Sequence, residues 1–349
     1  MPSYVAYDER EPKCGQIAID RMRRFEKCTV FDTKRMLGKN FDEIAIDPSW
    51  PFEVKESDDK SCQIVLEKSD GLITLSPEEV SSSILKHIKE KADEYQQKHL
   101  KEAVIAVPSA FTEKQKCALL RAAKLAGWER IHYIPEPIAA AFAYSTEMKT
   151  PDDSKLLIFD FGGGTVDVCI VQIAMDNLQV ISFDGNYYLG GRDFDTLLYN
   201  HFDGILKHKH NIDVNVINKK YFLLKECQKI KHTLSVSDSY WLDVNDFNSE
   251  NNGLINITVH DFNSMASDNM TKIANVILNA LKKANLQRNE IDYIVQVGGA
   301  SRMPMIKKLL LDMFPASIHK CSQYPDWVIS QGSALYAYYL EHKEKQKHY

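Results

Sequence analysis

The 349-residue sequence contains no apolar run that approaches the ~20 residues needed to cross a bilayer. Its opening stretch, MPSYVAYDEREPK, has no signal-peptide core. Dense lysine and arginine runs are also missing, and the formal net charge of −5 is small for this length. These absences argue against a membrane protein and against an electrostatic footprint for nucleic acid or an anionic membrane surface.

The seven cysteines contain no CxxC pair. Scattered single cysteines argue against both a disulfide framework and a zinc site. We therefore expect reduced thiols and a cytoplasmic protein. The composition, 44% hydrophobic and 26% charged, is typical of a globular protein, and the length suffices for two domains.

Strand and helix signals alternate in the first half of the chain. A helix is predicted to begin after Ser76, because Ser76 can cap it and Glu79 completes a capping box. The continuous apolar run Ala103–Pro108 predicts a strand that is buried on both faces. Thr112 and Gln115 form a second capping pair at the start of the next helix. This alternation indicates an α/β protein.

A glycine-rich turn separates two apolar segments in the middle of the chain. The strand LLIFD ends at Asp160, and TVDVCIVQI is predicted to be a second strand. The glycines between them, Gly162, Gly163 and Gly164, permit positive φ and carry no side chains, so backbone N–H groups can converge on phosphate oxygens. Asp160 can hold Mg²⁺ through water, and Thr165 adds a hydroxyl. A plain β-turn is the alternative, but it does not account for the two acids that flank GGGT.

A second glycine pair follows another buried strand. The segment 294–304 predicts a strand that ends at Gly298 and Gly299, followed by a helix whose N-terminus can face a ligand. Glu136 stands where an earlier strand ends and a helix of small residues begins. Ligands bind at the carboxyl ends of strands in open α/β sheets, so Glu136 is a candidate ligand contact. The alternative is a tight helix crossing, and the sequence does not separate the two.

Five ordered motifs resemble the nucleotide-binding domain of the heat shock protein 70 chaperone family. They are VPSAFTEKQ, YIPEPIAAAFAY, DFGGGTVD, YLGGRDFD and VQVGGASRMP. The resemblance extends from Pro2 to about Leu340. It implies an α/β actin-like (ribonuclease H-like) fold, in which two lobes close on ATP or ADP with Mg²⁺.

The resemblance also implies how the chain is divided between the lobes. Lobe I would comprise residues 1–149 and 322–349, with an outer part at 1–76 and a base at 77–149. Lobe II would comprise residues 150–321, with an outer part at 190–267.

Site roles follow from the same resemblance. Asp160 would position Mg²⁺ and the attacking water, Glu136 would belong to the same network, and Thr165 would lie near the γ-phosphate. The phosphate loop of lobe II would consist of Gly162, Gly163 and Gly164. The residues that would hold the adenosine are Lys231, Ser235, Gly298, Gly299, Arg302 and Asp326.

Departures from the family pattern affect the expected activity. Family members begin with a strand and a DLGTT-type loop, whereas this sequence begins after that point, so we expect an incomplete sheet in lobe I and no first phosphate motif. The family lysine two residues before the Trp of a WPF motif is replaced by Pro48. Losing one preorganised electrostatic group commonly costs ~10²–10³ in rate. Impaired ATP hydrolysis is therefore expected.

Further substitutions surround the expected nucleotide. Near the adenosine, Gln228 replaces a glutamate, His232 an arginine and Ala300 a serine. Arg192 replaces an acid in the motif YLGGRDFD. Each change removes or alters a charge or a hydrogen-bonding group, so we expect weak nucleotide binding.

Three functions remain open. The favoured one is an ATP/ADP-binding chaperone-family module with little or no ATPase activity. The second is a competent ATPase or small-molecule kinase on the same fold. The third is a non-enzymatic protein that competes for co-chaperones or nucleotide exchange factors, which are the expected partners. We also expect no peptide-binding domain in this chain, in contrast to what the resemblance implies for complete family members.

Overall fold

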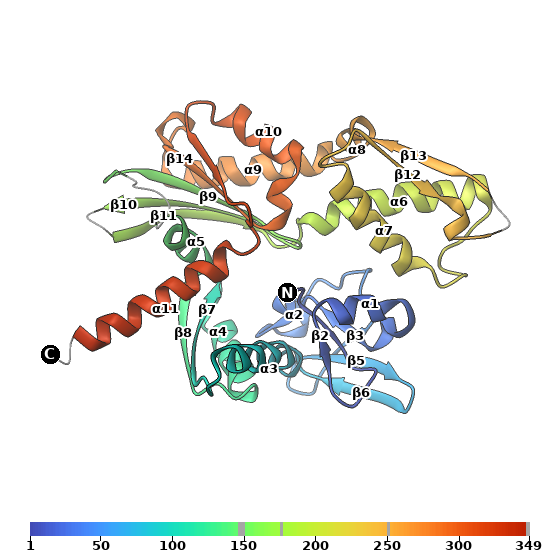
Figure 1. Cartoon of the computed structure of the whole chain (residues 1–349), viewed down its shortest axis with the longest axis horizontal. Coiled ribbons are helices and arrows are strands. Elements are labelled where there is room, and N and C mark those ends of the chain that lie inside the picture. Colours follow the sequence, from blue (N-terminus) through green and yellow to red (C-terminus); the bar gives the residue numbers. More distant parts are fainter. Residues whose placement is uncertain (146–150, 175–176, 250–251, 347–349) are drawn as a thin grey trace. The chain divides into compact units, whose positions relative to one another are not determined.

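The computed structural model describes residues 1–145, 151–174, 177–249 and 252–346. The chain divides into two compact units, Met1–Tyr133 and Ile134–Tyr349 (Figure 1). The lobe boundary predicted at 149–150 lies outside the described residues. Within the described parts, no helix is long and apolar enough to span a membrane.

Unit 1 contains small antiparallel sheets and flanking helices. Its first sheet has the order β2-β1-β3 and its second the order β4-β5-β6. The strands are β1 (Tyr4–Ala6), β2 (Lys13–Cys14), β3 (Thr29–Phe31), β4 (Glu53–Glu56), β5 (Cys62–Lys68), β6 (Gly71–Leu75), β7 (Glu102–Val107) and β8 (Arg130–Pro135), the last of which reaches into unit 2. The helices are α1 (Gln16–Phe25), α2 (Thr33–Met36), α3 (Pro77–Gln96) and α4 (Glu113–Leu125).

Both predicted capping boxes are confirmed. At the start of α3, the backbone N of Glu79 donates to Ser76 Oγ (3.2 Å) and the backbone N of Ser76 donates to Glu79 Oε2 (2.7 Å). At the start of α4, the backbone N of Gln115 donates to Thr112 Oγ1 (3.3 Å) and the backbone N of Thr112 to Gln115 Oε1 (3.0 Å). These pairs satisfy backbone donors that have no partner inside the helix.

The prediction that 103–108 is a strand buried on both faces is wrong. β7 forms where expected, but Ala103–Ala106 are half-exposed and only Val107 and Pro108 are buried. In the described part of the chain, β7 pairs with β8 alone. Ala103 and Ile105 pack against the buried side chains around Trp128. The apolar run predicted the strand correctly but could not report how many strands flank it.

Unit 2 is built on a mixed sheet with the order β11-β10-β9-β14-β15. The strands β9, β10 and β11 are antiparallel, while β14 is parallel to both β9 and β15. Their bounds are β9 (Lys155–Phe161), β10 (Val166–Ala174), β11 (Asn177–Asn186), β14 (Tyr293–Val297) and β15 (Ile318–Cys321). The two strands predicted on either side of the glycine turn are therefore confirmed as β9 and β10.

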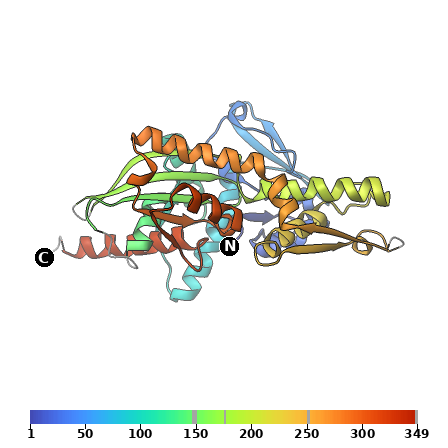
Figure 2. The ribbon, with the colours of Figure 1, turned by 90° about the horizontal axis from the view of Figure 1, so that it is seen from above.

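Helices cover both faces of this sheet. One face packs against α9 (Ser267–Ala284), which runs along the sheet in Figure 2, and against α10 (Pro304–Met313). The other face packs against α5 (Glu136–Ser145) and the start of α11 (Val328–Gln346). Side chains alternate along the strand, and Val166, Val168 and Ile170 of β10 face the α9 side. Because helices pack on both faces of the sheet, the ends of β9 and β14, which carry the glycine turns, are held in place.

The remainder of unit 2 extends the α9 side of the core. It consists of α6 (Gly191–His210), α7 (Lys220–Thr233), β12 (Ser239–Asp243), β13 (Leu254–Thr258) and α8 (Val259–Met265) (Figure 1). The strands β12 and β13 form an antiparallel ladder. Buried side chains of α6 and α7, such as Phe194 and Ile230, belong to the same apolar cluster as β9 and β10. The start of α6 is thereby held against the end of β9.

Candidate functional site

The predicted glycine turn GGGT and the glycines of the motif YLGGRDFD contact one another through their backbones. The N–H of Gly191, at the start of α6, donates to the carbonyl of Gly162 (3.0 Å), and the N–H of Arg192 donates to that of Gly163 (2.9 Å). The N–H of Gly162 in turn donates to Thr165 O (3.0 Å) and closes the hairpin turn. The segments GGGT and LGGR therefore form one structure.

The three glycines after Asp160 do not adopt the positive φ that the sequence suggested, so that part of the prediction is wrong. Instead, the absence of side chains in this turn lets a neighbouring backbone segment pack against it. A Cβ on Gly190 would lie 2.5 Å from the backbone of Gly164, which real side chains essentially never do. Gly163 is exposed, and a Cβ there would meet nothing within 4 Å. Close backbone packing on one side and open space on the other suit a turn that receives a ligand.

Gly298 brings the second glycine pair to the same place. Its φ is +83°, and a Cβ there would lie 2.4 Å from the carbonyl O of Phe161 and 2.8 Å from Asp160 Oδ1. Its N–H donates to Pro325 O (2.9 Å). Only glycine allows the end of β14 to approach Asp160 this closely. The two turns predicted separately thus meet at one half-exposed carboxylate.

Lys231 lies on α7 and is buried against this cluster. Its ammonium donates to Gly191 O (2.7 Å) and to Asp195 Oδ2 (2.8 Å), and Ser235 Oγ donates to Lys231 O (3.1 Å). Burial raises the pKa of the Asp195 carboxyl, and the neighbouring Lys231 ammonium opposes that rise. Sequence reasoning identified Lys231 and Ser235 but missed Asp195, which ends the motif YLGGRDFD.

Arg302 and Asp326 lie together at the exposed side of the Gly298 turn. The guanidinium donates to Gln323 O (2.5 Å) and lies 3.5 Å from Asp326 Oδ1. A Cβ on Gly299 would be 3.9 Å from Asp326 Cβ. Sequence reasoning overlooked an exposed aromatic pair beside them, Tyr324 and Trp327, whose rings stack with centroids 4.9 Å apart.

Glu136 opens α5 and is half-exposed. The tight crossing that was the alternative reading of its alanine-rich helix is confirmed, because a Cβ on Gly332 of α11 would lie 1.7 Å from Ala139 O. The proposed role of Glu136 as a ligand contact stays a prediction. The two readings are compatible, because the crossing involves the alanines that follow.

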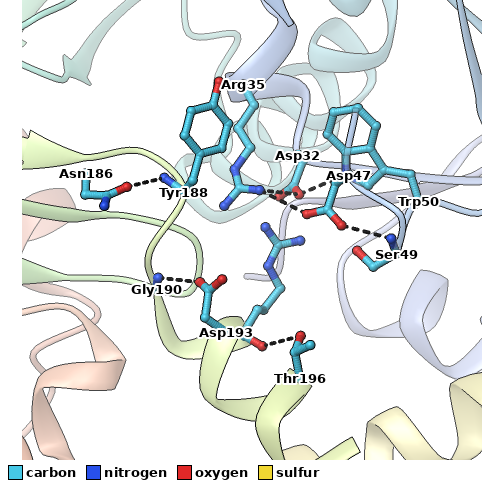
Figure 3. A network of polar contacts seen from close by, with 11 residues as sticks. Asp32, Arg35, Asp47, Ser49, Trp50, Asn186, Tyr188, Gly190, Asp193 and Thr196 are labelled. Carbon is cyan, nitrogen blue, oxygen red and sulfur yellow. Dashed lines mark hydrogen bonds and ion pairs between the residues drawn. The ribbon is translucent and has the colours of Figure 1, made fainter. Parts of the chain in front are cut away.

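The residues on either side of Pro48, Asp47 and Ser49, belong to a polar network of unit 1 (Figure 3). Arg35 Nη1 is 3.2 Å from Asp47 Oδ2 and 3.7 Å from Asp32 Oδ2. Trp50 Nε1 donates to Asp32 Oδ2 (3.1 Å). Lys34, on the same short helix α2, is exposed. Arg35 therefore supplies positive charge to this network beside Pro48.

Figure 3 also shows how the N-terminus of α6 is capped in unit 2. The N–H of Gly190 donates to Asp193 Oδ2 (2.7 Å), and Thr196 Oγ1 donates to Arg192 O (3.0 Å). The first bond fixes the turn that carries Gly190 and Gly191. Asp193 thus supports the backbone that packs on GGGT.

The residues present fit a nucleotide with Mg²⁺. Backbone N–H groups at glycine turns suit phosphate oxygens, and the Asp160 carboxylate with the Thr165 hydroxyl offers the oxygen ligands or water contacts that Mg²⁺ prefers. Within the described residues, no cluster of three or more His, Cys, Asp or Glu side chains could hold a metal by itself. Mg²⁺ would therefore be held largely through water and phosphate.

Comparison with known proteins identifies the relatives of this chain. A sequence family described as Hsp70 protein matches residues 1–348. Heat shock cognate 70 kDa protein 3 of Dictyostelium discoideum is 33% identical over 344 residues, which cover 96% of this chain and 54% of that protein. The ribosome-associated molecular chaperone SSB of Candida glabrata is 34% identical over 339 residues, 96% of this chain and 55% of that protein. The chain spans about half the length of the curated relatives it matches.

Proposed function

This chain belongs to the Hsp70 family and has the mixed α/β architecture of its actin-like ATPase domain, and we propose that unit 2 binds ADP and ATP with Mg²⁺. The observation that carries this proposal is the convergence of GGGT, Gly190–Gly191 and Gly298 around Asp160. These contacts bring the exposed backbone of Gly163 and the half-exposed carboxylate of Asp160 to one place. That arrangement suits phosphate and its metal ion.

The positions of the side chains suggest a role for each residue of the site. The GGGT turn would receive the phosphates, Asp160 would orient water around Mg²⁺, and Thr165 would add a hydroxyl donor. Bound Mg²⁺ would neutralise phosphate charge. Lys231, Ser235, Arg302 and Asp326, with Gly298 and Gly299, would hold the adenosine. By family membership, co-chaperones and nucleotide exchange factors are the proposed partners.

We further propose that this chain hydrolyses ATP slowly. Proline stands at position 48, where the family resemblance implies a lysine, and Arg192 stands where it implies an acid. Removing one charged group from a preorganised site commonly costs ~10²–10³ in rate.

The direct test is calorimetric titration of the purified chain with ADP and Mg²⁺, combined with an ATP turnover assay. We expect saturable ADP binding and slow turnover. Asp160→Asn should lower the remaining turnover by at least tenfold, because the neutral amide no longer orders water and Mg²⁺. Asp184→Asn is the matched control, since this acid of unit 2 forms a surface ion pair with Lys283 (2.7 Å) and should leave turnover unchanged.

Two results would contradict the proposal. A protein that melts cooperatively but shows no saturable ADP binding would exclude the nucleotide function. Turnover that Asp160→Asn leaves intact would exclude the assigned role of Asp160.

A further inference from the structure

The hydroxyl of Tyr144 joins two strand ends that lie beside the candidate site. It donates to Gln296 O (3.2 Å) and accepts a hydrogen bond from the backbone N of Ser322 (2.7 Å). Gln296 belongs to β14, and Ser322 directly follows β15. The ladder between β14 and β15 has its last pair at Gln296 and Cys321, so the hydroxyl lies where the two strands end.

The ring of Tyr144 is held by its apolar surroundings. Tyr144 lies on α5 and is only 3% exposed. It belongs to the apolar cluster between α5 and the sheet, together with Ile158 of β9 and Val297 of β14. A buried tyrosine hydroxyl usually finds a hydrogen-bond partner, and this one both donates and accepts. Because packing holds the ring, the hydroxyl also holds the two backbone groups to which it is bonded.

The loop 322–327 continues from this point to the Gly298 turn. The N–H of Gly298 donates to Pro325 O (2.9 Å). The next residue of the loop, Asp326, has its Oδ1 atom 3.5 Å from the Arg302 guanidinium. The position of the loop relative to the turn therefore depends in part on the tyrosine hydroxyl, which bonds to both chain segments just before they meet.

The Gly298 turn is also the part of unit 2 that approaches Asp160. A Cβ on Gly298 would lie 2.8 Å from Asp160 Oδ1. Tyr144 itself is too deeply buried to touch a ligand there. An effect of its hydroxyl on a ligand must therefore pass through the loop 322–327 and the side chains that the loop carries.

Resting on the nucleotide-binding function proposed above, we propose that Tyr144 is a positioning residue for the nucleotide. Its hydroxyl holds the loop 322–327, and with it Asp326, against the Gly298 turn, where the adenosine is proposed to bind. The GGGT turn, which is proposed to receive the phosphates, is held by separate backbone hydrogen bonds to the start of α6. Tyr144 therefore acts on adenosine binding and not on phosphate binding.

The first test removes the hydroxyl and keeps the ring. Tyr144→Phe should bind ADP about tenfold more weakly in calorimetric titration, because the loop loses one of its attachments. Tyr240→Phe is the matched control, since the Tyr240 hydroxyl on β12 donates to Glu226 Oε2 (3.4 Å) and its loss should leave ADP affinity unchanged. The titrations use a temperature at which circular dichroism shows each variant to be folded, so that lower stability is not counted as weaker binding.

A double-mutant cycle tests whether the effect passes through the loop. Asp326→Ala removes a carboxylate that the loop carries, and the effects of coupled residues are not additive. In the Asp326→Ala background, Tyr144→Phe should therefore cost less than about twofold in ADP affinity. In the Thr165→Ala background it should keep its full effect, because Thr165 belongs to the phosphate turn. A general loosening of unit 2 would instead cause the same loss in both backgrounds.

The outcomes separate the positioning role from the nucleotide function on which it rests. If the unmodified chain binds ADP and Tyr144→Phe binds it equally well, the positioning role is wrong and the nucleotide function stands. A loss of equal size in the Asp326→Ala and Thr165→Ala backgrounds also overturns the role, because the hydroxyl would then not act through the loop. If the unmodified chain folds but does not bind ADP, the nucleotide function falls and this inference falls with it.

Discussion

Single glycines determine how closely the backbone segments of the site approach one another. Gly298 has positive φ and stands against the Phe161 carbonyl and the Asp160 carboxylate. Gly190 stands against Gly164 in the same way. The sequence predicted that these glycines matter, but it assigned positive φ to GGGT. The structure places positive φ at Gly298 instead, because that is where β14 must turn beside β9.

Gly298→Ala should destabilise unit 2 and displace Asp160. The added methyl would meet backbone at 2.4 Å in a conformation that L-residues rarely adopt. We expect the free energy of unfolding to fall by roughly 2–4 kcal/mol, measured by chemical denaturation. Gly163→Ala is the control, because nothing lies within 4 Å of the added methyl, and its stability should change by less than about 0.5 kcal/mol. Equal stability of the two variants would contradict this account of Gly298.

Some site residues could be read from the sequence and others could not. Asp160, Thr165 and the glycines belong to local turns whose residue types reflect their chemistry. Asp195 belongs to the site only through its ion pair with Lys231, which is 36 positions away in the sequence and on another helix. Tyr324 and Trp327 likewise look like ordinary loop residues until their rings are seen to stack.

At the scale of helices and strands, local sequence signals predicted where elements begin, but they did not predict how deeply a strand is buried. The capping boxes predicted at Ser76 and Thr112 form as expected, because all of their hydrogen bonds lie within one helical turn. The burial of β7 depends on which strands flank it, which is a property of the whole sheet. A continuous apolar run therefore predicted the strand but overestimated how much of it is covered.

The capping box at α3 provides a test at this scale. Ser76→Ala removes the side-chain acceptor for the backbone N–H of Glu79 and should lower the free energy of unfolding by about 1 kcal/mol. Ser82→Ala in the same helix is the control, because its Oγ donates only to Glu79 O inside the helix, and alanine is a better helix former. Urea denaturation of both variants measures the difference. A Ser82→Ala variant that loses as much stability as Ser76→Ala would contradict the capping role.

For the molecule as a whole, the order of motifs was the most informative feature of the sequence. Five motifs predicted the family and the fold, and the family match over residues 1–348 confirms the family. The mixed sheet of unit 2, with helices on both faces, agrees with the predicted architecture. The sequence could not show that the separate turns meet, because that depends on the strand order β9-β14.

Hydrogen exchange with and without saturating ADP and Mg²⁺ tests the central claim most directly, because it locates the ligand. We expect exchange to slow at 160–165, at 189–192 and at 298–302, the turns of unit 2 that converge on Asp160, since bound nucleotide would cover these turns and stabilise the hydrogen bonds between them. Slower exchange at these segments would support the account. Saturable ADP binding that leaves exchange in all three segments unchanged would contradict it.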